Sequence, residues 1–176
     1  MTLEELCAQG ILKGYGIAAW SGFEETEGAA KLVPSDILDM MCGVGSGHHF
    51  RAIQLPLSLV KIKPISAYFQ KRGPIDMALR EKVDIFGSSP LHGGLLPPVL
   101  KSAFFKQLGA LLTAAEACLL FAKSVPGISA TFTSPTSVQQ RHQRFDVSKL
   151  APLSEEKRRS IVGLLTKHSG KYRDAS

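Results

Sequence analysis

Short apolar runs alternate with amphipathic segments along the chain. Four runs are predicted to be strands, at residues 14–20, 50–55, 83–88 and 128–132, and the first of them is apolar on both faces. The spacing of apolar residues predicts helices before, between and after them, over 3–12, from 34 to the glycines at 43–47, and over 74–82, 102–125, 134–144 and 154–168. Strands that alternate with helices are typical of a parallel sheet, either doubly wound or part of a barrel.

Proline and glycine mark the expected ends of these elements. Pro126-Gly127 ends the long helix 102–125, and Ser134 before Pro135 is expected to be the N-cap of the next helix. The stretch from Pro56 to Gly73, which is interrupted by Pro64, is expected to be a loop. The same holds for residues 89–98, which contain three prolines and two glycines.

Composition is that of an ordinary globular protein. The 176 residues are 44% hydrophobic and 20% charged, enough for one domain, 1–176, with a substantial core. No run of about 18 apolar residues occurs, so the sequence predicts no membrane-spanning helix. The first residues carry acids rather than a basic segment, which argues against a secretory signal. Three cysteines without C-x-x-C spacing fit reduced thiols, so we expect a cytoplasmic protein.

The formal net charge of +6 raises the question of an anionic partner. Much of the basic charge lies near the C-terminus, around 157–159, directly after Glu155 and Glu156. That arrangement fits a solvated helix face, and it lacks the interleaved aromatic residues of a nucleic-acid surface. We therefore expect neither a nucleic-acid nor a membrane partner.

Four segments, in this order, resemble aldo-keto reductases. Residues 12–23 resemble the family's fifth strand, which in one bacterial and plant branch continues into a Trp-x-Gly-Phe loop. Residues 48–56 resemble the sixth strand, and 88–95 the Ser-Pro-Leu turn after the seventh. Residues 124–128 with 133–135 resemble the eighth strand and its phosphate-binding loop. The resemblance covers about residues 1–145, and 146–176 form a C-terminal helix and tail.

The resemblance implies half of a (β/α)8 TIM barrel, with four parallel strands and NADP(H) across their C-terminal ends. Gln54 matches the glutamine that bonds the nicotinamide carboxamide, and Ser88 stands where an aromatic residue often stacks on the nicotinamide. Ser89, Pro90 and Leu91 match the turn along the pyrophosphate. At the adenosine end of the cofactor, Ser134 matches the serine that contacts the 2′-phosphate. Gln140 and Arg141 stand in place of a Glu-Asn pair that reads adenine. Arg141 could still hold a phosphate as a fork.

Several family residues are replaced or missing. Ala18-Ala19 stand in place of a Ser-Asn pair that grips the carboxamide, and Thr133 in place of a basic residue. The catalytic Asp, Tyr, Lys and His all come from the first four strands, which this chain lacks. Because hydride transfer to a carbonyl needs a proton donor beside the accepting oxygen, the resemblance implies a protein that has lost canonical reduction.

Histidines are the remaining candidates for chemistry. His92 follows the third strand and should face the mouth of the barrel, which makes it the first candidate for a catalytic group that titrates near neutrality. His48-His49 precede a strand and should lie at the opposite end. No zinc-ligand spacing occurs, so no metal is expected.

Half a barrel leaves two unpaired strand edges and an apolar inner face. Three arrangements would cover them: two copies that close a homodimer, another chain that supplies the missing half, or the terminal helix 154–168 packed over the open side. We expect the homodimer. Three functions remain open: a nucleotide pocket or a non-redox small-molecule reaction at the mouth, a non-catalytic partner subunit, and a reductase whose tetrad a partner restores.

Overall fold

Four parallel strands form one open sheet. The computed structural model describes residues 2–23, 32–45, 47–100 and 112–169. Within them the sheet has the order β1-β2-β3-β4, with every pair parallel. The strands are β1 Tyr15–Ala18, β2 Phe50–Pro56, β3 Asp84–Ser88 and β4 Ile128–Thr131. The prediction of four parallel strands that alternate with helices is confirmed.

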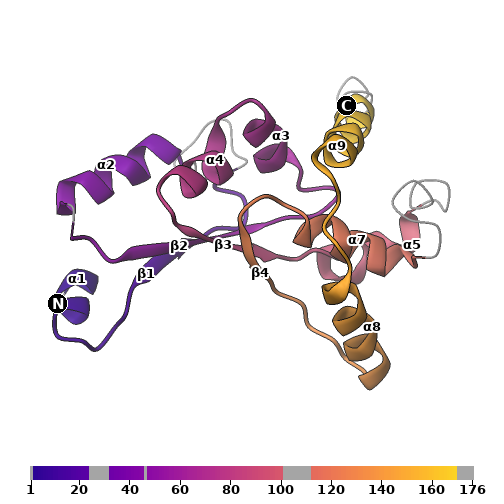
Figure 1. Ribbon diagram of the computed structural model, residues 1–176, viewed down its shortest axis with the longest axis horizontal. Coiled ribbons are helices and arrows are strands. Elements are labelled where there is room, and N and C mark those ends of the chain that lie inside the picture. Colours follow the sequence, from indigo (N-terminus) through magenta and orange to yellow (C-terminus); the bar gives the residue numbers. More distant parts are fainter. Residues whose placement is uncertain (1, 24–31, 46, 101–111, 170–176) are drawn as a thin grey trace.

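Helices precede, connect and follow the strands (Figure 1). They are α1 Leu3–Ala8, α2 Pro34–Val44, α3 Lys63–Phe69, α4 Gly73–Arg80, α5 Leu96–Val99, α7 Ala114–Lys123, α8 Val138–Lys149 and α9 Glu155–Ser169, with a 3₁₀ turn at His92–Gly94. In Figure 1, α2, α4 and α3 lie along one side of the sheet, and α7 and α8 lie beyond β4. The expected boundary at residue 145 would fall inside α8.

Two segments that were expected to be loops contain helices. Pro64 does not break α3, because it lies in the first helical turn, where a proline's missing N–H has no partner to lose. The same reason explains α5, which has proline in its first turn. For the long helix 102–125, residues 101–111 lie outside the described part of the chain. The remainder forms α7, which begins at a capping box between Thr113 and Glu116.

The register of the strands divides the sheet into two faces. Ile17, Ile53, Ile85 and Ile128 pair in one row across all four strands. Ile53 and Ile85, at the centre of this row, are fully buried. They join a core that includes the following helix residues: Ile37 and Met41 of α2, Ile65 of α3, Ile75 and Met77 of α4, and Cys118 and Phe121 of α7. This row therefore fixes the sheet to its helices.

The next row lies on the opposite face, which would line the inside of a closed barrel. It consists of Ala18, Gln54, Phe86 and Ala130. Ala18 and Ala130 are exposed, whereas Gln54 and Phe86 are half-buried. The terminal helix α9 does not cover this face at its centre, since its described contacts are with α3 and with Ser124 after α7. The inner face stays open along the middle of the sheet.

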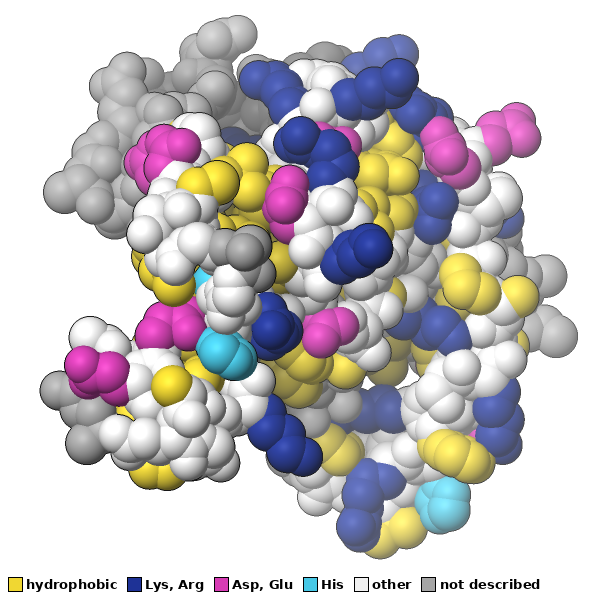
Figure 2. Space-filling model, turned by 60° about the vertical axis from the view of Figure 1, so that its left-hand side comes forward, with side chains coloured by type: hydrophobic (Ala, Val, Ile, Leu, Met, Phe, Trp, Pro, Cys, Tyr) yellow, Lys and Arg dark blue, Asp and Glu magenta, His cyan; other side chains and the backbone are white. Residues whose placement is uncertain are grey.

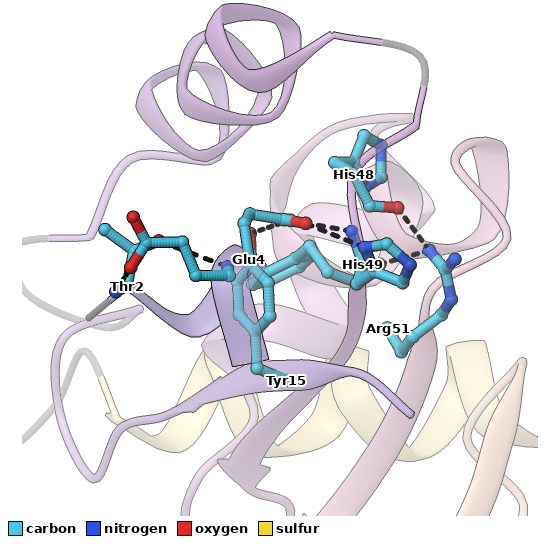
Figure 3. Close-up of polar contacts among 8 residues, drawn as sticks. Thr2, Glu4, Tyr15, His48, His49 and Arg51 are labelled. Atoms are coloured by element: carbon cyan, nitrogen blue, oxygen red, sulfur yellow. Dashed lines mark hydrogen bonds and ion pairs between the residues drawn. The ribbon is translucent and has the colours of Figure 1, made fainter. Parts of the chain in front are cut away.

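A carboxylate ties α1 to the N-terminal end of the sheet (Figure 3). Glu4 accepts hydrogen bonds from Tyr15 Oη at 2.7 Å and from the backbone N–H of His49 at 2.8 Å, and its other oxygen lies 2.7 Å from His49 Nδ1. These donors, first of all the two from His49, lower the pKa of Glu4 to about 2. Burial, and then the bond to Glu4, raise the pKa of Tyr15 to about 12. His49 therefore serves as a structural partner at the end of the sheet away from the barrel mouth.

Surface charge of both signs is interspersed on the face that Figure 2 shows. Lys and Arg side chains spread over much of it, with Asp and Glu among them rather than in one separate stripe. No helix in the described ranges is long and apolar enough to cross a membrane.

The Glu4 cluster predicts a pH-dependent stability. The folded pKa of about 2 lies below the ordinary 4.5, so the stabilisation is complete above about pH 4.5 and is lost as the pH falls through about 2. Glu4→Gln should therefore melt at a lower temperature than wild type at pH 7, and the difference should shrink below pH 4.5. The exposed control Glu81→Gln should melt like wild type at both pH values. Equal melting of Glu4→Gln and wild type at pH 7 would show that the cluster contributes nothing.

Candidate ligand-binding site

A cavity of about 550 Å³ lies at the C-terminal ends of β2, β3 and β4. Its walls come from β2, from the turn after β3, from the loop after β4 and from one face of α8. The lining residues are Gln54, Ser88, Ser89, Pro90, Leu91, Gly93, Gly94, Phe132, Thr133, Ser134, Thr136, Gln140 and Arg144. A concave site with apolar walls and a few convergent polar groups, at the C-terminal ends of parallel strands, is a typical place for a small-molecule ligand.

Most residues that the resemblance singled out line this one cavity. They are Gln54, Ser88, Ser89, Pro90, Leu91, Ser134 and Gln140. Gln54 belongs to the inner-face row of the sheet, and Ser88 comes two residues after Phe86 of the same row, so both point to this side. Arg141 and His92 do not line the cavity. Arg141 is exposed on α8, and His92 lies at the rim next to Gly93.

The turn after β3 is held in an uncommon backbone conformation. Ser89 and His92 have positive φ angles of 51° and 49°. The φ angles of Gly93 and Gly94 are also positive, at 68° and 88°. Such angles cost free energy in a residue with a side chain and need support from the surroundings. Here His92 N–H donates to Ser89 O at 2.9 Å, and Leu57 N–H donates to Ser88 O at 3.0 Å. The hydrogen bonds bend the turn back over the cavity.

His92 stacks against an aromatic residue from another loop. Its ring lies 6.2 Å from that of Trp20, centroid to centroid, with 27° between the planes. Lys61 Nζ lies 5.8 Å from the centre of the Trp20 ring. The His92 Nδ1 atom is buried and has no hydrogen-bond partner among the described residues. Loops that follow β1, β2 and β3 thus meet at the rim of the cavity.

The expected cap of the helix after β4 is wrong by three residues. Ser137, not Ser134, is the N-cap of α8, because its side chain accepts from Gln140 N–H at 3.1 Å. Ser134 lies in the preceding loop, and the helix continues past residue 144 to Lys149. The sequence contained the signal, since Ser137 and Gln140 have the S-x-x-Q spacing of a capping box. That pattern outweighs the Ser-Pro pair at 134–135.

Gln140 connects the start of α8 to the cavity wall. Its side-chain Oε1 accepts from Thr136 N–H at 2.9 Å and from Thr136 Oγ1 at 3.2 Å. These bonds hold the loop from Ser134 to Thr136 against the helix. Ser134, Thr136 and Gln140 therefore form one polar corner of the cavity.

Sequence reasoning missed two large side chains in the cavity. Phe132 follows β4 and stacks on Phe86, with ring centroids 5.5 Å apart and planes 4° apart. Arg144 lies one helical turn after Gln140, and this i,i+4 spacing was the available signal. Burial lowers the pKa of Arg144, and its Nη1 is buried without a hydrogen-bond partner in the described part of the chain. The arginine that faces the cavity is Arg144 rather than Arg141.

No side chain at this site suggests a metal centre. Among the described residues, no group of three or more His, Cys, Asp and Glu side chains could hold a metal ion.

Solved aldo-keto reductases share this fold. No family model and no curated protein matches the chain. Aldo-keto reductase AKR11C1 from Bacillus halodurans, in its holo form, aligns with a TM-score of 0.64 at 15% identity over 92% of this chain and 53% of its own length. Its apo form aligns with a TM-score of 0.63. The thermostable aldo-keto reductase Tm1743, in complex with the inhibitor epalrestat, gives 0.60 at 15% identity, with 52% of its length covered.

The chain therefore has the fold of half an aldo-keto reductase barrel, which confirms the resemblance. It spans about half the length of these solved structures. Its four strands match part of a (β/α)8 barrel, and its sheet is not closed.

The corrected helix cap gives a direct stability test. Ser137→Ala removes the acceptor for Gln140 N–H and should lower the free energy of unfolding by about 1 kcal/mol. Ser134→Ala removes no cap and should change it by less than about 0.5 kcal/mol. Urea unfolding of the two variants measures both values. The opposite ranking would restore Ser134 as the cap.

Proposed function

We propose that this chain is the cofactor-side half of an aldo-keto-reductase-like barrel, that it binds an NADP(H)-type dinucleotide, and that it does not reduce carbonyls on its own. The observation that carries the proposal is the single cavity in which Gln54, Ser89 and Ser134 come together with Gln140. These residues are separated by as many as 86 positions in the sequence, between Gln54 and Gln140. The resemblance assigns all of them to one cofactor.

The polar groups in the cavity fit such a ligand. Gln54 offers an amide to the carboxamide at one end, and the corner of Ser134, Thr136 and Gln140 offers hydroxyl and amide groups to the adenosine end. The turn 89–91 also lines this cavity. When bound, the dinucleotide would supply hydride chemistry. The chain's own contribution is to hold it in place and to limit its access to water.

The same cavity lacks an effective proton donor. No Tyr, Lys, His, Asp or Glu side chain is among the residues that line it in the described part of the chain. Serine and threonine hydroxyls are poor acids near neutral pH, so protonation of an alkoxide would be slow. A partner that brings the missing groups would restore reduction, and loss of cofactor binding would leave a non-catalytic subunit.

NADPH fluorescence titration tests cofactor binding. Gln140→Ala should weaken the affinity about threefold to tenfold, because it removes a side-chain hydrogen bond worth about 1 kcal/mol. Gln139→Ala is the matched control, since Gln139 is an exposed neighbour on the same helix that does not line the cavity. The affinity of Gln139→Ala for NADPH should lie within twofold of the wild-type affinity. Absence of NADPH binding at millimolar concentration would refute the cofactor assignment.

A turnover assay tests the second half of the proposal. With NADPH and an aromatic aldehyde such as 4-nitrobenzaldehyde, the purified chain should oxidise NADPH no faster than a protein-free blank. We expect no turnover because the chain lacks the proton donor, although it has the cofactor site. Turnover above the blank, retained through a second purification, would show that the chain carries a donor of its own.

A further inference from the structure

A second cavity, of about 310 Å³, lies between β4 and the helices α7 and α8. All four residues of β4, Ile128 to Thr131, line it, as do Leu119 and Val147 from the two helices. β4 pairs with β3 alone, so its other edge has no neighbouring strand in the described ranges. The cavity therefore runs along a free strand edge and has apolar walls.

Two polar groups in this cavity lack partners. Arg144 Nη1 and Thr131 Oγ1 are both buried and have no hydrogen-bond partner among the residues described. Arg144 also borders the larger cavity, but Thr131 lines only this one. The two residues that carry these unpartnered groups thus both line the space beside β4. A buried donor without a partner is costly, and a buried cation more so.

The other cation in this cavity is already compensated. Lys123 Nζ donates to the carbonyl oxygens of Val147, Ser148 and Leu150, at 3.1, 2.8 and 2.6 Å, where α8 ends. These bonds also anchor α8 to α7, which keeps the space beside β4 open. Arg144 has no such acceptor in the described part of the chain. A group in this cavity that carries negative charge would compensate Arg144.

We propose that a β-strand from outside these 176 residues pairs with the free edge of β4, beneath α8, and places a carboxylate against Arg144. Strand addition would satisfy the edge of the sheet, and an aspartate or glutamate on the added strand would satisfy the guanidinium. A second copy of this chain fits less well. Its two edge strands, β1 and β4, have the sequences Tyr-Gly-Ile-Ala and Ile-Ser-Ala-Thr, neither of which contains an acid, and each copy carries a net charge of +6.

A pair of matched peptides tests the proposal. Each is a fluorescein-labelled, ten-residue peptide of alternating valine and threonine, with either one central glutamate or one central glutamine. The glutamate peptide should bind the full chain about tenfold more tightly or better, by fluorescence anisotropy, because only it offers a charged acceptor. Hydrogen exchange should slow at the amides of residues 128–131 when it binds.

Variants on one helix separate the role of Arg144 from general charge. Arg144→Gln should bind the two peptides equally, whereas Arg141→Gln, which removes an exposed arginine three residues away, should keep the discrimination. Thr131→Val gives an independent test on the strand and should weaken the binding of the glutamate peptide. Circular dichroism melting confirms that each variant is folded, and Arg144→Met, which also removes the charge, replaces Arg144→Gln if the latter is not.

Four results would overturn the proposal. They are equal affinity of wild type for both peptides, no binding of either, a dimer at micromolar concentration whose β4 amides are protected without peptide, and benzoate binding that competes fully with the peptide. The dimer would show that a second copy of this chain occupies the edge of β4. Competition by benzoate would show that the cavity binds small carboxylic acids. NADPH binding is measured separately through Gln140, which lines the larger cavity and not this one.

Discussion

The parallel register of four strands is the constraint from which the other features follow. Because Ile17, Ile53, Ile85 and Ile128 fall into one row, the helices that bury this row must all lie on one face of the sheet. Gln54 and Phe86 are then forced onto the opposite face, since successive side chains alternate. A slip of one residue in β2 would bury Gln54 among the helices and turn Ile53 towards the cavity.

Charge compensation differs sharply between the two ends of the sheet. At the N-terminal end, Glu4 has three donors in reach and holds α1 in place. At the C-terminal end, Arg144 is desolvated without an acceptor among the described residues. The carboxylate at the first end is compensated by donors of the chain itself, whereas the guanidinium at the second has no acceptor in the part of the chain that the structure describes. This asymmetry agrees with a structure that spans about half the length of the solved reductases and has an open edge at β4.

The strands and most helices could be predicted from the sequence, because their apolar spacing is strong and glycine or proline stands at their ends. The errors arose where one local signal competed with another. Pro64 predicts a break although it occupies a first helical turn, and Ser134 before Pro135 predicts a cap although Ser137 has the capping-box spacing. The site residues came from the resemblance, since their separation hides them from any local pattern. Phe132 matches no motif, and Arg144 has only its i,i+4 spacing from Gln140, so the fold is needed to place both at the cavity.

The hydrogen bonds of Gln140 fix the polarity of the cavity's corner. Thr136 N–H can only donate, so the oxygen of the Gln140 amide must face it, and the two amide hydrogens are left for the other side. A molecule in this corner consequently meets a donor rather than an acceptor. Ring nitrogens and phosphate oxygens satisfy such a group, whereas ammonium groups do not. The way this helix begins therefore selects among ligands as well as stabilising the fold.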